Sequence, residues 1–314
     1  MTTIATVFAT VLSTPSFLDT SPITPHMGHL HAIILAIVEG LTEFLPISST
    51  GHMIITQGIL GIKSSPFVKI YLVNIQFGAI LSVLVYYFRR FLNFKSFDFY
   101  IKLGIAFIPA AVLGVTLNKW IEKSLDSVPI VATSLIIGGI LIIWTDRIYH
   151  SQIEEVIEPA DAKKEDDDPH ASAEVPIPDI KLTYLQAFIV GLFQTIAMIP
   201  GVSRSAITII GGLTQKLRMK EAAEFSFFLA VPTISAAALY KTVKGFEEIK
   251  GGDEMQNLLL GNLIAFVVAM IAIRFFVTFI SKHGMKIFGY YRIVIGILIL
   301  VSLYVFHLPL EIIK

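Results

Sequence analysis

Two polar stretches lie within apolar sequence, and their residue types suit the binding of phosphate groups. In the first, Glu39 and Glu43 precede the run Leu-Pro-Ile-Ser-Ser-Thr-Gly-His52. The second, residues 200–208, reads Pro-Gly-Val-Ser-Arg204-Ser-Ala-Ile-Thr. Ionisable side chains at membrane depth are costly and usually face a cavity in which they act. The two stretches therefore predict a polar site inside a membrane.

The two carboxylates of the first stretch indicate a cation site. Glu39 and Glu43 are four residues apart, so on a helix they share one face, where two like charges destabilise each other. A divalent cation would relieve this repulsion, and magnesium or calcium takes carboxylate oxygens together with substrate phosphates. The alternative is a pair of glutamates at a water-exposed helix end, which their apolar neighbours disfavour.

The second stretch offers an anion site around Arg204. A guanidinium is always charged and can bind a phosphate through two parallel hydrogen bonds. Gly201 permits a tight bend whose amides can point at an anion, and hydroxyl donors surround the arginine. The alternative is an interfacial arginine that caps a helix end. We predict that the substrate-binding hydroxyls here are those of Ser203, Ser205 and Thr208.

The first stretch also holds candidate nucleophiles. Ser48, Ser49 and Thr50 precede His52 closely enough to share one bend with it. We predict that Ser48 and Thr50 bind the substrate and that Ser49 and His52 are catalytic. A hydroxyl beside an imidazole, which can move a proton near neutral pH, suits nucleophilic attack. A histidine that merely caps the helix is the rival interpretation.

Composition places these stretches in an integral membrane protein. Hydrophobic residues make up 54% of the 314 residues, charged residues 15%, and the mean hydropathy is +0.74. The formal net charge of +0 gives no basic excess that would suggest nucleic acid as a partner. The chain has no cysteine, which excludes disulfides, cysteine-ligated zinc and a thiol nucleophile.

Apolar runs predict the elements that position the site. A spanning helix needs about 20 apolar residues, and two further stretches, 29–60 and 184–213, are broken by Pro, Gly and Ser/Thr where a helix should continue. Broken backbone in a membrane survives only where protein or a wet cavity satisfies it, so we expect two re-entrant helical hairpins. The fold class is all-α, with six transmembrane helices at 68–88, 101–118, 128–146, 222–241, 257–280 and 287–306.

The two halves of the chain resemble each other. Gly40-Leu-Thr-Glu43 is echoed by Gly191-Leu-Phe-Gln194, and a hairpin followed by three spans is expected in each half. An odd number of spans inverts the second half, as in many transporters. We therefore divide the chain into an N-terminal extension (1–26), a first membrane repeat (27–146), an acidic cytoplasmic linker (147–182) and a second, inverted repeat (183–314). Whether translation starts at Met1 or Met27 stays open.

Loop charges orient this topology. With the N-terminus outside, the loops expected inside collect fourteen Lys and Arg residues, Arg292 among them, against eight outside. Positive residues favour the cytoplasmic side. Both termini and the entry to the first bend are therefore expected on the outer face.

Both motifs, in order, resemble the signature motifs of the bacterial undecaprenyl-diphosphatase family linked to bacitracin resistance. The resemblance runs from about Met27 to the C-terminus and includes Ala-Glu-Phe-Ser-Phe at 223–227. Departures are the N-terminal extension, the long acidic linker, and Ala206 where the family is expected to favour glycine. None of these removes a reactive group.

The resemblance implies hydrolysis of undecaprenyl diphosphate to undecaprenyl phosphate and inorganic phosphate, with divalent-cation activation. It implies that Glu39 and Glu43 bind metal or activate a nucleophile, and that Arg204 clamps the phosphates. Ser49 or His52 would attack or shuttle the proton. It further implies a multi-pass protein of the bacterial inner membrane with its site open to the outer face, and bacitracin as a competitor that sequesters the substrate. The sequence does not decide whether two copies form a homodimer.

The rival function is transport, as a transporter or flippase of a polyprenyl phosphate lipid. Inverted repeats with broken helices are typical of transporters, and the same phosphate-binding residues would serve either function. Carboxylates beside Ser49 and His52 favour hydrolysis, because hydrolysis needs a base or nucleophile next to the phosphorus.

Overall fold

The computed structural model describes residues 27–91, 97–117, 120–121, 127–149, 180, 182–249 and 251–305, and the regular structure in these ranges is helical. Six of the described helices are long and apolar enough to cross a membrane, which confirms the six predicted spans. They are α4 (Pro66–Tyr86), α6 (Phe97–Thr116), α8 (Val128–Tyr149), α12 (Met219–Lys244), α13 (Gly252–His283) and α14 (Lys286–Tyr304). The proposed extension 1–26 and most of the linker 147–182 lie outside the described residues.

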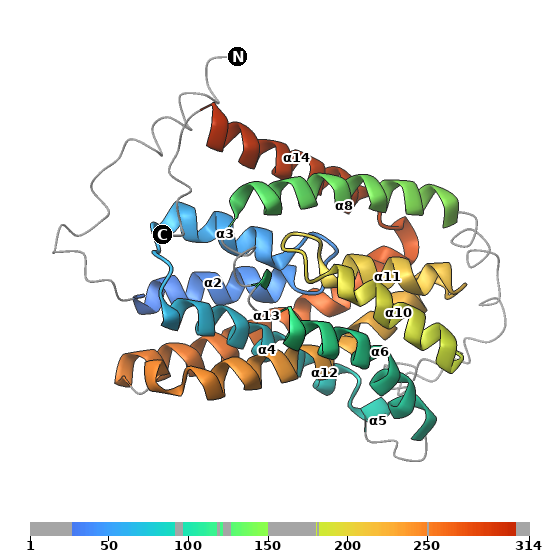
Figure 1. Cartoon of the computed structure of the whole chain (residues 1–314), viewed down its shortest axis with the longest axis horizontal. Coiled ribbons are helices and arrows are strands. Elements are labelled where there is room, and N and C mark those ends of the chain that lie inside the picture. The colour runs from blue at the N-terminus through green and yellow to red at the C-terminus, as the bar shows by residue number, and fades with distance from the viewer. Residues whose placement is uncertain are drawn as a thin grey trace, which may run out of the picture.

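The two broken stretches form helix pairs, as predicted. The first pair is α2 (His29–Thr42) and α3 (Ser49–Leu60), and the second is α10 (Tyr184–Ile196) and α11 (Arg204–Thr214). Within each pair the two helices pack against each other. The pairs enter the molecule from opposite ends, and their connecting bends meet near its middle (Figure 1). This arrangement is consistent with two re-entrant hairpins.

The two halves of the chain are interlaced. Helix α2 of the first half packs on α13 of the second, and α10 of the second half packs on α6 of the first. Helices α4 and α12 pack on each other, as do α8 and α14. Each of these four contacts has its counterpart when the halves are exchanged, which is the pattern expected of an inverted repeat.

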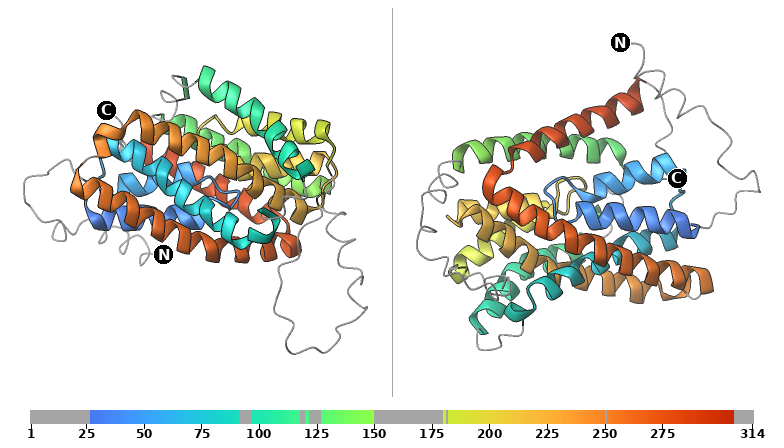
Figure 2. Two further views of the ribbon diagram at one scale, coloured as in Figure 1. Left: turned by 90° about the horizontal axis from the view of Figure 1, so that it is seen from below. Right: turned by 180° about the vertical axis from the view of Figure 1, so that it is seen from behind.

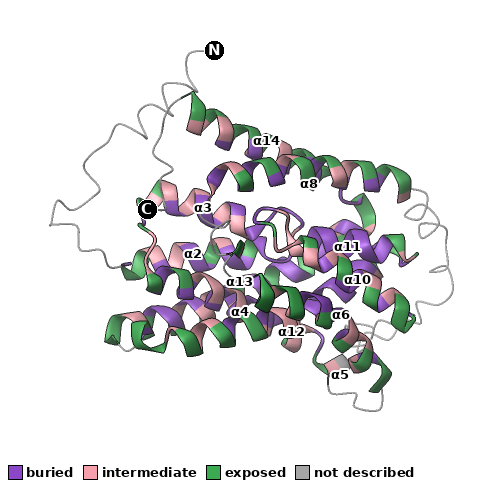
Figure 3. Ribbon diagram, viewed as in Figure 1, coloured by how far each residue is buried: buried purple, intermediate pink, exposed green. Residues whose placement is uncertain are grey.

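The helices form layers around the two bends. The α8–α14 pair lies along one side, α4, α12 and α13 lie along the other, and the short helices fill the space between them (Figures 1 and 2). Buried residues gather around the central bends, whereas the outward faces of the long helices are exposed (Figure 3). Those faces carry large apolar side chains, such as Ile137, Leu259 and Leu298. A lipid environment accounts for such faces, because water would disfavour them.

Two short helices complete the described part of the chain. Helix α5 (Phe88–Phe91) follows α4, and the 3-10 helix η2 (Phe246–Ile249) joins α12 to α13. One sequence assignment is wrong at this level. Arg292, counted with the cytoplasmic loop charges, lies inside α14 and is fully buried. The reason is that Arg292 belongs to the apolar run 287–306, which forms one helix from Lys286 to Tyr304 in spite of this single charge.

Candidate active site

Two serines shape the central bends in the same way. Ser48 and Ser203 precede α3 and α11 with φ values of 72° and 71°, a left-handed conformation that non-glycine residues seldom adopt. Each hydroxyl accepts a hydrogen bond from a backbone N–H three residues on, that of Gly51 or Ala206, at 3.3 Å. Both serines therefore cap the helices that they precede. That they also bind substrate stays a prediction.

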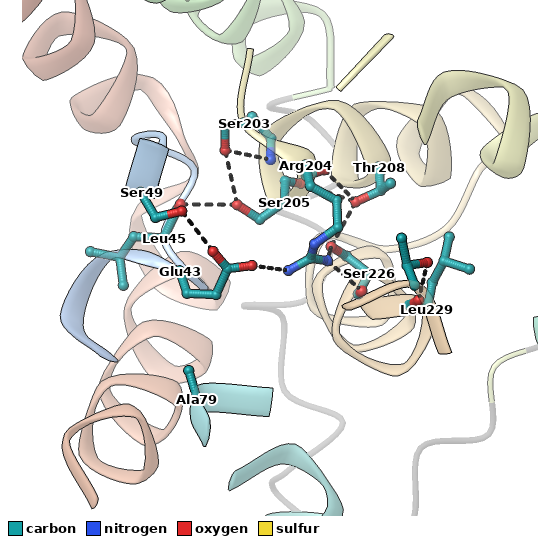
Figure 4. Close-up of polar contacts among 12 residues, drawn as sticks. Glu43, Leu45, Ser49, Ala79, Ser203, Arg204, Ser205, Thr208, Ser226 and Leu229 are labelled. Carbon is teal, nitrogen blue, oxygen red and sulfur yellow. Dashed lines mark hydrogen bonds and ion pairs between the residues drawn. The ribbon is translucent and has the colours of Figure 1, made fainter. Parts of the chain in front are cut away.

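A chain of polar contacts joins the bends (Figure 4). The Ser49 hydroxyl donates to Glu43 Oε2 at 2.7 Å, and Glu43 Oε1 pairs with Arg204 Nη2 at 3.2 Å. Glu43 lies at the end of α2, whereas Ser49 and Arg204 are the first residues of α3 and α11. The structure thus brings together a carboxylate, a hydroxyl and a guanidinium from the two predicted motifs, although they are about 160 residues apart.

Helix α12 holds the other side of the arginine. Arg204 Nη1 donates to the Ser226 carbonyl at 2.9 Å and lies 3.4 Å from the Ser226 hydroxyl. Thr208 Oγ1 is 2.7 Å from that hydroxyl and donates to the Arg204 carbonyl at 2.8 Å. Thr208 therefore supports the arginine through Ser226. Arg204 Nε is buried without a hydrogen-bond partner, which leaves one donor for a ligand.

A side chain of the second bend is hydrogen-bonded to the backbone of the first bend. Ser205 donates to the Leu45 carbonyl at 2.9 Å, and its hydroxyl lies 3.1 Å from that of Ser203. Gly201 has a φ of +90°, and a Cβ there would lie 2.6 Å from the Val131 carbonyl oxygen. The tight bend predicted at Gly201 is therefore present, and it requires glycine for both conformation and space.

Glu39 stands one turn before Glu43 on α2 and is the least satisfied polar group of the site. Its side chain is fully buried, and neither carboxylate oxygen has a hydrogen-bond partner. A buried charge without partners is costly, so these oxygens fit a cation or a donor that arrives with the substrate. Among the described residues, no group of three or more His, Asp or Glu side chains could hold a metal. Protein ligands for a cation would thus be few, as is usual where substrate phosphates complete the shell.

The remaining predicted residues lie at the edge of this cluster. His52 Nδ1 is 2.8 Å from the Ser48 carbonyl oxygen, so this nitrogen carries the proton, and Nε2 lies 2.7 Å from the Tyr291 hydroxyl. The two rings stack with centroids 5.6 Å apart. Thr50 is partly exposed at the start of α3. Both ring nitrogens of His52 are therefore engaged outside the contacts that join Ser49, Glu43 and Arg204.

Sequence reasoning missed three residues that contact the predicted ones: Ser226, Tyr291 and Arg292. Ser226 lies in the segment 223–227 that carried part of the family resemblance, so a signal for it existed. Arg292 interrupts a long apolar run, which is the signal that marks a functional or structural charge in a membrane. Tyr291 carried no signal beyond its place beside that arginine.

The fold and the site together define a polytopic membrane protein in which a largely buried arginine and two buried carboxylates meet at the junction of two broken helices. Residues 32–298 match the family described as Bacitracin resistance protein BacA. The chain belongs to this family.

Curated relatives cover nearly the whole chain. An undecaprenyl-diphosphatase of Bdellovibrio bacteriovorus is 51% identical over 282 residues, which is 90% of this chain and 98% of the relative. One of Flavobacterium psychrophilum is 49% identical over 91% of this chain and 100% of its own length. One of Aquifex aeolicus is 41% identical over 86% of this chain and 97% of its own length. The described site residues lie within the matched part of the chain.

Proposed function

We propose that this protein hydrolyses undecaprenyl diphosphate to undecaprenyl phosphate and inorganic phosphate, which recycles the lipid carrier of cell-wall synthesis. The observation that carries this proposal is the continuous contact from Ser49 through Glu43 to Arg204 at the junction of the two bends. It supports the roles of nucleophile for Ser49, base for Glu43 and phosphate-binding cation for Arg204, because the three side chains are in contact. The names of the relatives, all undecaprenyl-diphosphatases, supply the substrate.

Ser49 is the nucleophile that this geometry favours. Its hydroxyl already donates to Glu43 Oε2, so Glu43 can take the proton as the Ser49 oxygen attacks the terminal phosphorus. A bond from the serine oxygen to that phosphorus forms, and the bond to the bridging oxygen breaks. Undecaprenyl phosphate leaves with the bridging oxygen. Water then attacks the phosphoserine, inorganic phosphate departs and the serine regains its proton.

Arg204 supplies the positive charge that the transferred phosphoryl group needs. Its Nε is unpartnered, and its Nη2 is shared with Glu43 at 3.2 Å, so both can turn to phosphate oxygens without loss of the contact with Ser226. Preorganised donors of this kind stabilise the charge that develops in phosphoryl transfer. Ser205 and Thr208 hold the bend and the arginine in place.

The unpartnered carboxylate of Glu39, beside Glu43, fits a divalent cation such as magnesium or calcium. When bound, such a cation neutralises charge on the diphosphate and weakens the repulsion between substrate and carboxylates. Glu39 would be its principal protein ligand, and Glu43, whose Oε2 accepts from Ser49, would share in holding it. This division would give each of the two acidic residues, one turn apart, a separate role.

The proposal includes a location and two further partners. The protein would lie in the bacterial inner membrane, with the first bend open to the outer face, where the diphosphate is released. Bacitracin would compete with the enzyme by sequestering its substrate. A homodimer is compatible with this function, and the mass of the purified protein in detergent would decide it.

Transport of a polyprenyl phosphate lipid is the second candidate, because the interlaced repeat of broken helices resembles the plan of transporters. The two functions differ in their need for a nucleophile. A lipid transporter has no use for a serine hydroxyl held 2.7 Å from a buried carboxylate, whereas a hydrolase does.

Phosphate release from undecaprenyl diphosphate by the purified protein in detergent tests the proposal. We expect release that a chelator abolishes, and that is lost in Ser49→Ala and Arg204→Ala. Ser281→Ala is the matched control, since that serine hydroxyl donates only to the Val277 carbonyl near the end of α13. No release by well-folded wild-type protein, with release equally absent for farnesyl diphosphate, would refute hydrolysis and favour transport.

A further inference from the structure

Arg292 of α14 is a buried cation outside the contacts described above. Its side chain is fully buried, and it is among the largest fully buried side chains of the described residues. Within the described part of the chain, its guanidinium donates five hydrogen bonds, all to backbone carbonyls, so peptide dipoles compensate its charge. They are Nε to Leu135 at 3.4 Å, Nη2 to Ser134 at 3.2 Å and Gly201 at 2.9 Å, and Nη1 to Pro46 at 3.2 Å and Val202 at 3.0 Å.

These contacts join both bends of the site. A single nitrogen, Nη1, donates to Pro46 in the first bend and to Val202 in the second. Pro46 stands two residues before Ser48, and Val202 directly precedes Ser203. Those two serines hold the left-handed conformations at φ 72° and 71°, which are strained and persist only where the surroundings fix them. Arg292 contacts the backbone beside both of them at once.

We propose that Arg292 is a positioning residue of the hydrolytic site, which locks the two bends together through their carbonyls. Ser49 and Arg204 directly follow the two strained serines, so the distance of each from Glu43 depends on how the bends are held. The inference rests on the proposed function for its kinetic part. Arginine is required because a guanidinium has five N–H donors in a planar fork, and five carbonyls surround it.

Helix α8 is shaped to admit this guanidinium. Gly138 faces it, and a Cβ added at Gly138 would overlap Nη2 and lie 2.9 Å from the central carbon of the guanidinium. Nearby, Gly139 and Gly289 let the backbones of α8 and α14 approach closely, since a Cβ on either would lie within 2.7 Å of the other's carbonyl oxygen. The substitution Gly138→Ala therefore displaces the guanidinium but does not remove its positive charge.

Four substitutions separate positioning from mere folding. Arg292→Met removes all five donors, Arg292→Lys keeps the charge with fewer donors, and Gly138→Ala moves the fork. Gly104→Ala is the matched glycine control, because nothing lies within 4 Å of a Cβ there. Each variant is first shown to be monodisperse in detergent, and its kcat and KM for undecaprenyl diphosphate are then measured per folded molecule.

We expect kcat to fall about 100-fold in Arg292→Met, the loss that a displacement of about 1 Å can cause, with KM little changed. Arg292→Lys should recover part of this loss, Gly138→Ala should lower kcat in the same direction, and Gly104→Ala should match wild type. A purely structural arginine would instead lower the yield of folded protein and leave kcat unchanged. That result would overturn the proposal.

A second measurement does not depend on hydrolysis. The chain has no cysteine, so Ser49→Cys introduces a single thiol at a site that is 9% exposed. We expect slow alkylation of this thiol in the otherwise unchanged chain, and faster alkylation when Arg292→Met or Gly138→Ala is added. Equal rates in all backgrounds would overturn the positioning role. If wild-type protein releases no phosphate, the proposed function fails, and the alkylation rates alone decide the role of Arg292.

Discussion

Ser49 and Glu43 should behave as one catalytic unit, and a double-mutant cycle can show it. The hydroxyl of Ser49 lies 2.7 Å from Glu43 Oε2, both groups are buried, and neither can perform its part of the proposed attack without the other. The variants are Ser49→Ala, Glu43→Gln and the combination of both.

The loss of activity expected for each variant follows from the role of Glu43 as a general base for Ser49. A positioned general base contributes about 10²–10⁴-fold to a rate, which is about 3–5 kcal/mol of activation free energy. Each single variant should therefore lose about 10³-fold in kcat/KM. If the two groups acted independently, the double variant would lose about 10⁶-fold, whereas members of one unit lose about as much together as alone. We expect about 10³-fold for the double variant too.

The assay is the initial rate of phosphate release at saturating magnesium, per folded molecule. A mock purification from cells that lack the protein sets the background of contaminating phosphatases. Glu248→Gln and Ser281→Ala, alone and combined, are the matched controls, because both residues lie outside the site. Losses that multiply in the double variant would refute the proposed proton transfer. Full activity of Ser49→Ala would refute the nucleophile itself.

Three further predictions follow from single contacts. Glu39→Gln removes a buried, unpartnered carboxylate, so the half-activating magnesium concentration should rise by about ten-fold or more, equivalent to about 1.4 kcal/mol. Arg204→Lys cannot contact Glu43 and Ser226 together, and the loss of a charged hydrogen bond worth about 1.5–3 kcal/mol should lower kcat/KM about 10–100-fold. Gly78→Ala would place a Cβ against the backbone of Asn262 where α4 meets α13, and should destabilise the protein by about 1–3 kcal/mol in thermal unfolding.

A specific result would contradict each of these three predictions. An unchanged magnesium dependence in Glu39→Gln would place the cation elsewhere. Wild-type kinetics in Arg204→Lys would show that only a positive charge is needed, without the bidentate geometry. If Gly78→Ala unfolds at the same temperature as Gly104→Ala, the close approach of α4 and α13 is not required for stability.

The sequence alone determined the class of protein, the spans and the two polar motifs. Long apolar runs leave little choice in a membrane, because every backbone polar group must be bonded within a helix. For the same reason, Pro, Gly and serine clusters at 45–51 and 200–205 were sufficient to predict two helix breaks. Residue type and spacing in the motifs were also sufficient to predict chemical roles for Glu39, Glu43, Ser49 and Arg204.

The tertiary structure decided which of these residues lie in contact. The hydroxyls of Ser48 and Ser203, for which the sequence predicted only a role in substrate binding, cap α3 and α11, and this capping depends on a backbone conformation that residue type does not reveal. The spacing of His52 predicted that it shares a bend with Ser49, whereas its contact with Tyr291, about 240 positions away, could not be predicted. Contacts at such separations depend on how helices pack, and local sequence carries little information about packing.

Arg292 marks this division most clearly. Its sequence position suggested a cytoplasmic loop charge, because a lone arginine near the end of an apolar run resembles many others. Only the folded chain shows five carbonyl groups from α8 and both bends converging on one guanidinium, with Gly138 leaving the space for it. The sequence determined that a charge is present at position 292. The packing of α8, α14 and the two bends determined which groups surround that charge. Every residue has the same peptide carbonyl, so only the tertiary structure decides which carbonyls come together.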